Sequence, residues 1–296
     1  MYNNGNEILF LREKNDMKKY HIEKNTVQET LIIPLFARKV CSEKFPQLFN
    51  DQEAVRICGM LDYDFAARAK KMNSSVGLFG ALEVAQRQYD LAWEVRDYLT
   101  NHPNASVVNL GCGLDDTFRK CDNGSCHGFN IDMSDVINVR NELLPEGVRE
   151  ENLPCDLNDF SWMDKIAGKN PVKNGAVFFA SGVFYYFKTE EVKKLVCKMA
   201  EKFPDSVLVF DSCNQRGSKL MTKTWLKEAG IKDVSVFFSL ENESVLHSWS
   251  SSFKTVSSRS YMRGYRDIYK DVSFFHKLMI KFCEKSVRMR IVKICF

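Results

Sequence analysis

The sequence lacks both the long apolar runs that cross a bilayer and an excess of charge of either sign. Its longest uncharged stretches, such as residues 175–187, are well short of the roughly 20 apolar residues that a membrane-spanning helix needs. The 42 lysines and arginines against 38 acidic residues leave a net charge of only +4, which argues against a dedicated nucleic-acid binder. The sequence therefore predicts a protein without integral membrane contact and without a nucleic-acid partner.

The sequence also predicts no secretory leader, because residues 1–12 are polar and no positively charged segment precedes a long apolar run. The ten cysteines stand at irregular spacings. Cys121 and Cys126 with His127 have a spacing close to that of metal ligands, but no second pair lies at the interval that structural zinc needs. We therefore expect a cytoplasmic protein whose cysteines are small buried residues, with no metal site.

Helical periodicity dominates the first third of the chain. Residues 1–25 show no sustained apolar period and form a lead-in. Apolar residues then recur at helical spacing in residues 26–40, 51–61, 62–72 and 80–99. Within the first of these segments, Pro34 predicts a kink or a new helix start. Residues 1–100 are therefore predicted to form a helical N-terminal cap or lid.

From residue 101 the pattern changes to alternating strands and helices. Short apolar runs stand at residues 107–110, 127–131, 176–180 and 207–210, and helical stretches at residues 134–144 and 190–203 separate them. Uniformly apolar strands are typical of a parallel sheet that is covered on both faces. The sequence thus predicts an α/β, doubly wound fold behind the helical cap.

The last quarter of the chain is less regular. Its predicted elements are a helix at residues 218–229, a strand at 234–238, a loop over the serine-rich residues 248–260 and a final strand at 289–296. No repeat or long linker divides the chain into independent domains. We assign residues 101–296 to one α/β core, in which residues 239–287 are a segment inserted on the substrate side.

An apolar strand runs directly into Gly111-Cys-Gly113, the most informative segment of the sequence. Glycines at this place let the backbone turn beneath a ligand at a distance that no side chain tolerates. About twenty residues on, the next strand ends at Asp132, where an acid can accept hydrogen bonds from both ribose hydroxyls. Asp156 follows at the end of a third strand and can accept from an adenine amino group, with Leu157 offering a backbone amide. Each residue also has an alternative interpretation when it is considered alone. The glycines could form an ordinary strand-to-helix turn, and each acid could be a solvated loop residue.

The segment departs from the dinucleotide-binding fingerprint. That fingerprint needs a third glycine, and Asp116 stands at its position. Asp115 and Asp116 would also repel a diphosphate. A nucleoside without phosphates fits better, and S-adenosylmethionine is the common one. A nicotinamide-dependent oxidoreductase is the disfavoured alternative.

Together these residues resemble the class I S-adenosylmethionine-dependent methyltransferases of the leucine carboxyl methyltransferase and polyketide O-methyltransferase superfamily. The resemblance covers most of the chain. Its segments are residues 27–38, 108–115, 122–124, 130–132, 135–137, 142–146, 181–187 and 208–211, with Phe118, Arg140, Phe203 and Pro204. The Asn-Leu-Gly-x-Gly-x-Asp and Gly-Val-x-x-Tyr-Phe runs occur together at the family's spacing. The resemblance implies a Rossmann-like fold with a seven-stranded, mostly parallel sheet, and methyl transfer to an oxygen of a small molecule.

The resemblance also implies roles for individual residues. The implied cofactor-binding residues are Arg87, Gly111, Gly113, Asp132, Met133, Asp156, Leu157 and Ser181. Arg87 pairs with the methionine carboxylate in this scheme, a task that suits a bidentate guanidinium. The alternative for Arg87 is a solvated helix charge. Tyr186 is implied to face the acceptor pocket, and its alternative is a buried aromatic residue.

Two departures from the family's pattern bear on cofactor binding. Many relatives have Asp-Thr-Arg after the glycines, where this chain has Asp115, Asp116 and Thr117. Others have a glutamate that holds the cofactor's α-amino group in place of Ser181, which can accept a hydrogen bond but carries no charge. We therefore expect weaker cofactor binding, or help from Asp115 or a backbone carbonyl. Ser181 also leaves open a non-catalytic protein of this fold that binds a nucleoside or a partner.

The chemistry of the acceptor depends on whether a base is present. A carboxylate, with a pKa of roughly 4, is ionised at neutral pH and needs none, whereas a phenol usually does. No residue is identified as that base, although His21, His247 and His276 could reach the site. We expect S-adenosylmethionine as cofactor, S-adenosylhomocysteine as product, and an acceptor with a carboxylate or hydroxyl, with a mild preference for a carboxylate.

Overall fold

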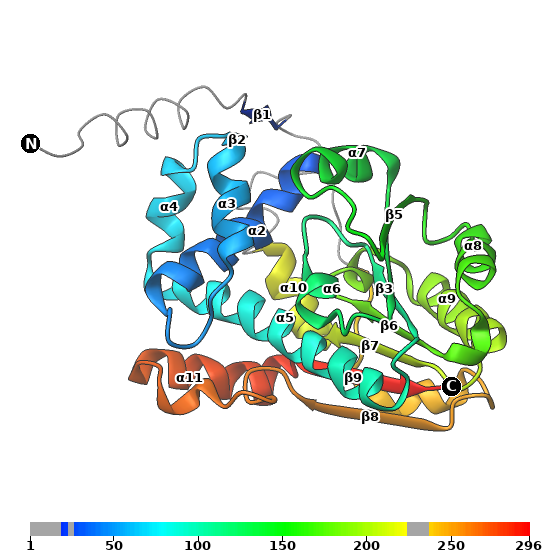
Figure 1. The fold of residues 1–296 in the computed structure, drawn as a ribbon. Helices are drawn as coiled ribbons and strands as arrows, with labels where there is room; N and C mark the ends of the chain where they lie inside the picture. The colour runs from blue at the N-terminus through cyan, green and yellow to red at the C-terminus, as the bar shows by residue number, and fades with distance from the viewer. Residues whose placement is uncertain (1–18, 23–26, 224–236) are drawn as a thin grey trace, which may run out of the picture.

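The computed structural model describes residues 19–22, 27–223 and 237–296. A seven-stranded sheet forms its centre (Figure 1). The strands are β3 (Ser106–Leu110), β4 (His127–Asp132), β5 (Glu150–Pro154), β6 (Ala176–Ala180), β7 (Val207–Ser212), β8 (Thr255–Ser260) and β9 (Arg290–Cys295). Their order is β5-β4-β3-β6-β7-β9-β8, and of these seven strands β9 runs antiparallel to its neighbours. The predicted seven-stranded, mostly parallel sheet is confirmed.

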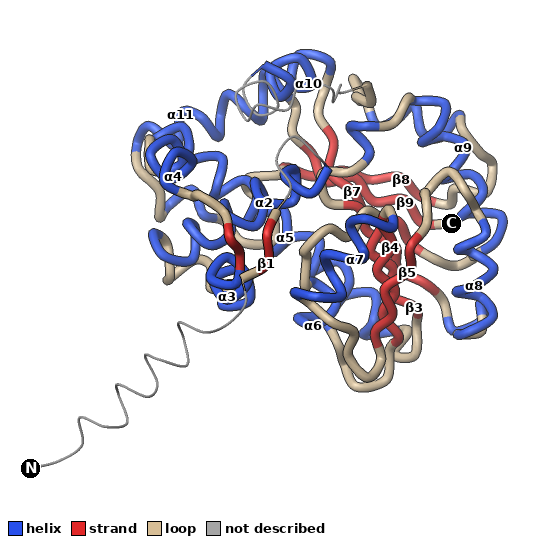
Figure 2. Tube along the Cα trace, turned by 90° about the horizontal axis from the view of Figure 1, so that it is seen from above, coloured by secondary structure: helices blue, strands red, loops and turns tan. Residues whose placement is uncertain are grey.

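Helices cover both faces of the sheet. The described α-helices are α2 (Val27–Lys44), α3 (Gln52–Met60), α4 (Ala66–Met72), α5 (Ser75–Asn101), α6 (Thr117–Cys121), α7 (Ser134–Leu143), α8 (Ser161–Lys169), α9 (Thr189–Lys202), α10 (Gln215–Met221) and α11 (Phe274–Phe282). α8 and α9 pack on one face, and α5 and α6 lie on the other (Figure 2). None of the described helices has the length and apolar character that a bilayer crossing requires.

The central strands explain why the sheet is predictable. Every residue of β3 and β6 is buried. Val107 packs in the apolar cluster that contains α2 and α5 residues, whereas Val108 packs in the cluster that contains Trp162 of α8. Successive side chains of a strand point to opposite faces, so a strand covered on both faces is largely apolar rather than alternating.

The long helix α5 links the N-terminal helices to the sheet. It packs against α2 and α4 and also against β6 and β7. The Ser74 hydroxyl begins the helix by accepting a hydrogen bond from the Gly77 amide at 3.1 Å. α2 is one helix that contains Pro34 rather than two segments. The structure therefore agrees with a helical N-terminal region.

The loop predicted for residues 248–260 is wrong in its second half. β8 occupies residues 255–260 and pairs antiparallel with β9. It is an edge strand whose side chains are largely polar and partly exposed. Its backbone pairing, rather than apolar side chains, holds it in the sheet, so the sequence pattern does not reveal it. β8 lies within the predicted inserted segment.

Other predictions near the sheet's edges meet mixed outcomes. The final strand is confirmed by β9, although it begins one residue later and ends one residue earlier. The helix predicted from residue 62 begins at residue 66, because β2 (Leu61–Asp62) pairs with β1 (Tyr20–His21). Three further predictions fall partly outside the described residues. They concern residues 224–229 of the predicted helix 218–229, residues 234–236 of the predicted strand 234–238, and residues 1–18 and 23–25 of the lead-in. Phe237 and Phe238 form no strand; both donate their backbone N–H to the Tyr185 carbonyl, at 2.7 and 3.3 Å.

Candidate active site

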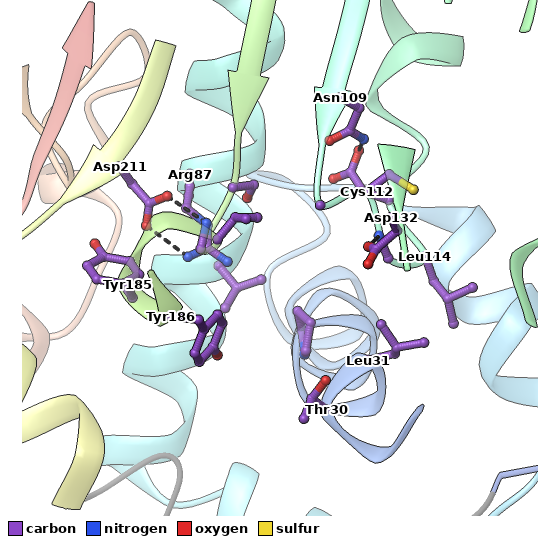
Figure 3. A pocket seen from close by; sticks show the side chains of 18 of the residues that line it. Thr30, Leu31, Arg87, Asn109, Cys112, Leu114, Asp132, Tyr185, Tyr186 and Asp211 are labelled. Carbon is purple, nitrogen blue, oxygen red and sulfur yellow. Dashed lines mark hydrogen bonds and ion pairs between the residues drawn. The ribbon is translucent and has the colours of Figure 1, made fainter. Parts of the chain in front are cut away.

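A cavity of about 480 Å³ lies at the carboxyl ends of strands β3 to β7. All nine predicted site residues line it: Arg87, Gly111, Gly113, Asp132, Met133, Asp156, Leu157, Ser181 and Tyr186. Thr30 and Leu31 of α2 face the strand ends across the cavity (Figure 3). The carboxyl ends of neighbouring parallel strands meet at one edge of the sheet, which brings residues far apart in the sequence together.

The glycine turn after β3 is tightly enclosed. Gly111 has a φ of +65° and Gly113 a φ of +48°, in the left-handed region that favours glycine. A Cβ atom on Gly111 would lie 2.6 Å from Cγ2 of Val183, and one on Gly113 would lie 3.2 Å from Cδ2 of Leu31. The turn therefore requires glycine for its backbone conformation and for its close neighbours.

Asp132 is fixed at the end of β4 by two backbone amides. Its Oδ2 accepts from the Gly113 N–H at 2.8 Å, and its Oδ1 accepts from the Met133 N–H at 2.8 Å. Burial raises the pKa of the Asp132 carboxyl, and these two hydrogen bonds oppose that rise. Each carboxylate oxygen keeps a second lone pair. The arrangement suits a ligand that carries two neighbouring hydroxyls.

Asp156, Leu157 and Met133 form the far end of the cavity. Asp156 is exposed, and its Oδ1 accepts from the Asn158 N–H at 2.9 Å, which shapes the loop after β5. Leu157 is buried, whereas Met133 is exposed although it borders the cavity. This end offers one apolar surface and one carboxylate.

Arg87 is not a solvated helix charge, because its side chain is only 14% exposed. Its Nη1 donates to Oδ2 of Asp211 at 3.0 Å, and Oδ1 of Asp211 accepts from the Gly182 N–H at 2.6 Å. Gly182 has a φ of +73°, and a Cβ there would lie 2.7 Å from Nη1 of Arg87. The Arg87 Nε is buried and has no hydrogen-bond partner among the described residues. The guanidinium is thus held at the cavity, and its Nε–H is still available to donate a hydrogen bond.

Tyr185 and Tyr186, in the turn after β6, both border the cavity but differ in exposure. Tyr186 is 41% exposed, whereas Tyr185 is buried. The alternative of a buried aromatic residue therefore describes Tyr185 rather than Tyr186. Tyr186 is thus a partly exposed residue of the cavity wall.

Asp115 is already committed to other partners. Its Oδ1 accepts from the Thr117 N–H at 2.7 Å, and its Oδ2 lies 3.0 Å from Nε2 of Gln88 and 3.4 Å from Nη1 of Arg38. The help that the sequence suggests from Asp115 in place of a glutamate at Ser181 has no support in this arrangement. Ser181 itself borders the cavity.

Sequence reasoning missed two acids of the cavity, Glu83 and Asp211. Glu83 lies four residues before Arg87 and so on the same face of α5, which was the available signal. Burial raises the pKa of the Glu83 carboxyl to about 7. Asp211 lies near the end of its strand, as Asp132 does at the end of β4, and that parallel was the signal for it.

The three histidines named as candidate bases lie elsewhere in the described structure. His276 is buried and its Nε2 contacts the Ser75 carbonyl at 2.9 Å, while His21 pairs with Asp62 at 3.5 Å. Neither they nor His247 border the cavity. Within the described part of the chain, no three His, Cys, Asp or Glu side chains gather in a group that could hold a metal.

Two curated relatives are methyltransferases by name. The tetracenomycin polyketide synthesis O-methyltransferase TcmP of Streptomyces glaucescens is 26% identical over 188 residues, which cover 63% of this chain and 66% of TcmP. The S-adenosyl-L-methionine-dependent methyltransferase dpfgK of Gibberella zeae is 24% identical over 189 residues, which cover 60% of this chain and 62% of dpfgK. The chain thus spans just under two thirds of the length of the curated relatives it matches.

Solved structures share the fold. A DUF574 family protein from Streptomyces avermitilis has a TM-score of 0.58 at 12% identity, covering 81% of this chain and 94% of that chain. A Thermobifida fusca protein assigned as a methyltransferase has a TM-score of 0.57 at 12% identity, covering 82% of this chain and 92% of that chain. At this identity, the likeness shows the fold alone.

The family itself follows from the sequence profile. The profile of the leucine carboxyl methyltransferase family matches residues 34–200, more than half of the chain. The matched region runs from α2 to α9 and contains eight further predicted site residues besides Arg87. The chain therefore belongs to the leucine carboxyl methyltransferase family.

Proposed function

We propose that this protein transfers a methyl group from S-adenosylmethionine to an oxygen atom of a small-molecule acceptor. One observation carries the proposal: the glycine turn at Gly111 and Gly113, the Asp132 carboxylate and the Arg87 guanidinium border a single cavity. The glycine turn lets a nucleoside approach the backbone closely, Asp132 can accept hydrogen bonds from two hydroxyls, and Arg87 can pair with a carboxylate.

The residues present fit this cofactor. Added Cβ atoms would fill the cradle at Gly111, the Asp132 oxygens keep free lone pairs, and the buried Arg87 Nε lacks a partner among the described residues. The cavity's volume of about 480 Å³ lies in the range of small-molecule sites. In this scheme Asp156 and Leu157 frame the adenine, with Met133 beside the ribose.

The cofactor supplies a sulfonium methyl carbon that is already electrophilic, so that an oxygen can form a bond to it in line while the C–S electron pair stays on sulfur. The protein's task is to orient and enclose. Arg87 and Asp132 hold the two ends of the donor, and Leu31 of α2 forms an apolar part of the cavity wall. Such alignment of two bound reactants contributes about 7–11 kcal/mol to catalysis.

An oxygen acceptor is supported by the name of the family and by that of TcmP, an O-methyltransferase. We propose a carboxylate or a hydroxyl of a small molecule, bound beside Tyr186 at the cavity's opening. A carboxylate needs no base at neutral pH.

Calorimetric titration of the purified protein with S-adenosylmethionine, S-adenosylhomocysteine and NAD tests the proposal. We expect micromolar binding of both sulfur nucleosides and no binding of NAD. Binding of NAD, or of neither sulfur nucleoside, would contradict it. Transfer of an isotopically labelled methyl group to a panel of carboxylic acids and phenols then identifies the acceptor class, because base releases methanol from esters and not from ethers.

A further inference from the structure

The cavity has two ends with different chemistry. In the proposed function, the end with Asp132 and Asp156 binds the nucleoside. At the other end, the α5 residues Glu83 and Arg87 meet Asp211 from β7 and Tyr261 from the segment after β8. Figure 3 shows this separation, with Arg87 and Asp211 together on one side and Asp132 on the other. A ligand that lies along the cavity therefore presents its nucleoside to one end and its remaining groups to the other.

Five carboxylates of the described residues border the cavity, and four of them already have strong partners. These four are Asp115 with Thr117 and Gln88, Asp132 with Gly113 and Met133, Asp156 with Asn158, and Asp211 with Arg87 and Gly182. The Glu83 carboxylate differs: among the described residues its hydrogen bond comes from the Cys283 thiol, with Sγ 3.6 Å from Oε1. A thiol is a weak donor. Within the described part of the chain, neither a cation nor a backbone amide donates a hydrogen bond to Glu83.

The groups that face Glu83 come from four segments. Arg87 lies on the same helix, Cys213 follows β7, Tyr261 follows β8 and Cys283 follows α11. Only Arg87 among them carries a positive charge, and it is paired with Asp211. Burial dominates, so the pKa of the Glu83 carboxyl rises to about 7. Near neutral pH this carboxyl is poised to lose its proton to solvent when a cation arrives.

Glu83 and Arg87 are spaced to bind a zwitterion. Residues four apart on a helix have neighbouring side chains, with about 5–6 Å between Cβ atoms. Such a pair would ordinarily form its own ion pair, yet the Arg87 guanidinium turns to Asp211 instead. α5 thus presents an anion and a cation side by side to the cavity. The methionyl end of the proposed cofactor carries an ammonium and a carboxylate on one carbon.

We propose that Glu83 binds the α-ammonium group of the cofactor's methionyl moiety while the neighbouring Arg87 binds its carboxylate. This inference rests on the proposed function, and it supplies the negative charge that Ser181 lacks. Glu83 is a specificity-determining residue in this scheme, because it favours ligands that retain the amino acid over those that end at the thioether.

Two probes that differ in the amino acid test the proposal by calorimetry. S-Adenosylhomocysteine has the amino acid, and 5′-methylthioadenosine has the same nucleoside and sulfur without it. Glu83→Gln keeps the shape and removes the charge. We expect it to weaken S-adenosylhomocysteine binding roughly 10- to 100-fold and to leave methylthioadenosine binding unchanged. Asp97→Asn, an exposed acid on the same helix, is the matched control and should change neither.

Proton release gives a second readout. Titration of the wild type near pH 7, in buffers of different ionisation enthalpy, should show protons released on S-adenosylhomocysteine binding and none on methylthioadenosine binding. Glu83→Gln should abolish the release. Unchanged S-adenosylhomocysteine affinity in Glu83→Gln, or an equal loss for both ligands, would overturn this inference alone. A wild type that binds neither ligand would overturn the proposed function with it.

Discussion

Arg87 and Asp211 form an ion pair between the middle of α5 and the carboxyl end of β7, with Nη1 and Oδ2 3.0 Å apart. Both side chains are largely buried. The pair keeps a guanidinium at the cavity without leaving its charge uncompensated, and Asp211 also holds Gly182 through its backbone amide. One contact therefore joins the long helix to the turns after β6 and β7, where the proposed cofactor and acceptor meet.

Arg87→Ala should weaken binding of S-adenosylmethionine about tenfold without eliminating it, because one charge-assisted contact is lost. It should also lower the free energy of unfolding by about 3 kcal/mol, since Asp211 is left buried without its cation. Calorimetry and denaturant unfolding measure the two effects. Arg96→Ala, at an exposed arginine of the same helix, is the control. An unchanged dissociation constant would remove Arg87 from the cofactor site.

Asp132→Ala should reduce binding of S-adenosylhomocysteine by at least about 100-fold, because two hydrogen bonds from the ribose to a charged group are lost. The fold should persist, as judged by circular dichroism. Asp135→Ala removes an exposed acid three residues further on and should leave affinity unchanged. Affinity close to that of the wild type in Asp132→Ala would contradict our placement of the ribose.

Gly111→Ala and Gly124→Ala separate backbone strain from steric conflict. Both glycines have positive φ, but a Cβ on Gly124 meets nothing within 4 Å, whereas one on Gly111 meets Val183 at 2.6 Å. Gly124→Ala should therefore cost only the left-handed strain of about 1–2 kcal/mol and preserve cofactor binding. Gly111→Ala should cost more and impair binding.

The double variant Gly111→Ala, Val183→Ala supplies the decisive comparison for this turn. Removing the Val183 methyl groups should recover part of the unfolding free energy that Gly111→Ala loses, measured by denaturant titration. Equal losses in the Gly111 and Gly124 variants, with no recovery, would show that the close contact with Val183 has no energetic weight.

The stability of the ligand-free protein should fall as the pH rises because of Glu83. Its carboxyl keeps its proton up to about pH 7 when folded, whereas an unfolded glutamate, with a pKa of roughly 4.3, loses it earlier. Between these values the folded state binds more protons, so its free energy of unfolding decreases with pH, by about 4 kcal/mol at most.

Glu83→Gln isolates this contribution from those of other buried acids. Denaturant unfolding at pH 5.5 and pH 8 should show a smaller decrease for the variant, which should be more stable than the wild type at pH 8. Parallel pH dependences of the two proteins would mean that Glu83 does not titrate differently on folding.

The central sheet and the strand-end residues that we assign to the cofactor can be predicted from the amino-acid sequence alone. β3, β6 and β7 are covered on both faces, so burial favours largely apolar runs, and such runs are visible without a structure. The turn at Gly111 was visible for a similar local reason, because its left-handed backbone requires glycine.

The edge strand β8 and the contacts at the Arg87 end of the cavity become visible in the folded chain. β8 is polar and is held by its ladder with β9, which no local pattern encodes. Arg87 and Asp211 are 124 positions apart in the chain, yet they form one ion pair. In the sequence, Glu83 is marked only by its position four residues before Arg87. Its chemistry comes from burial and from neighbours that the fold brings from distant segments, because the charge state of a side chain depends on its surroundings in space.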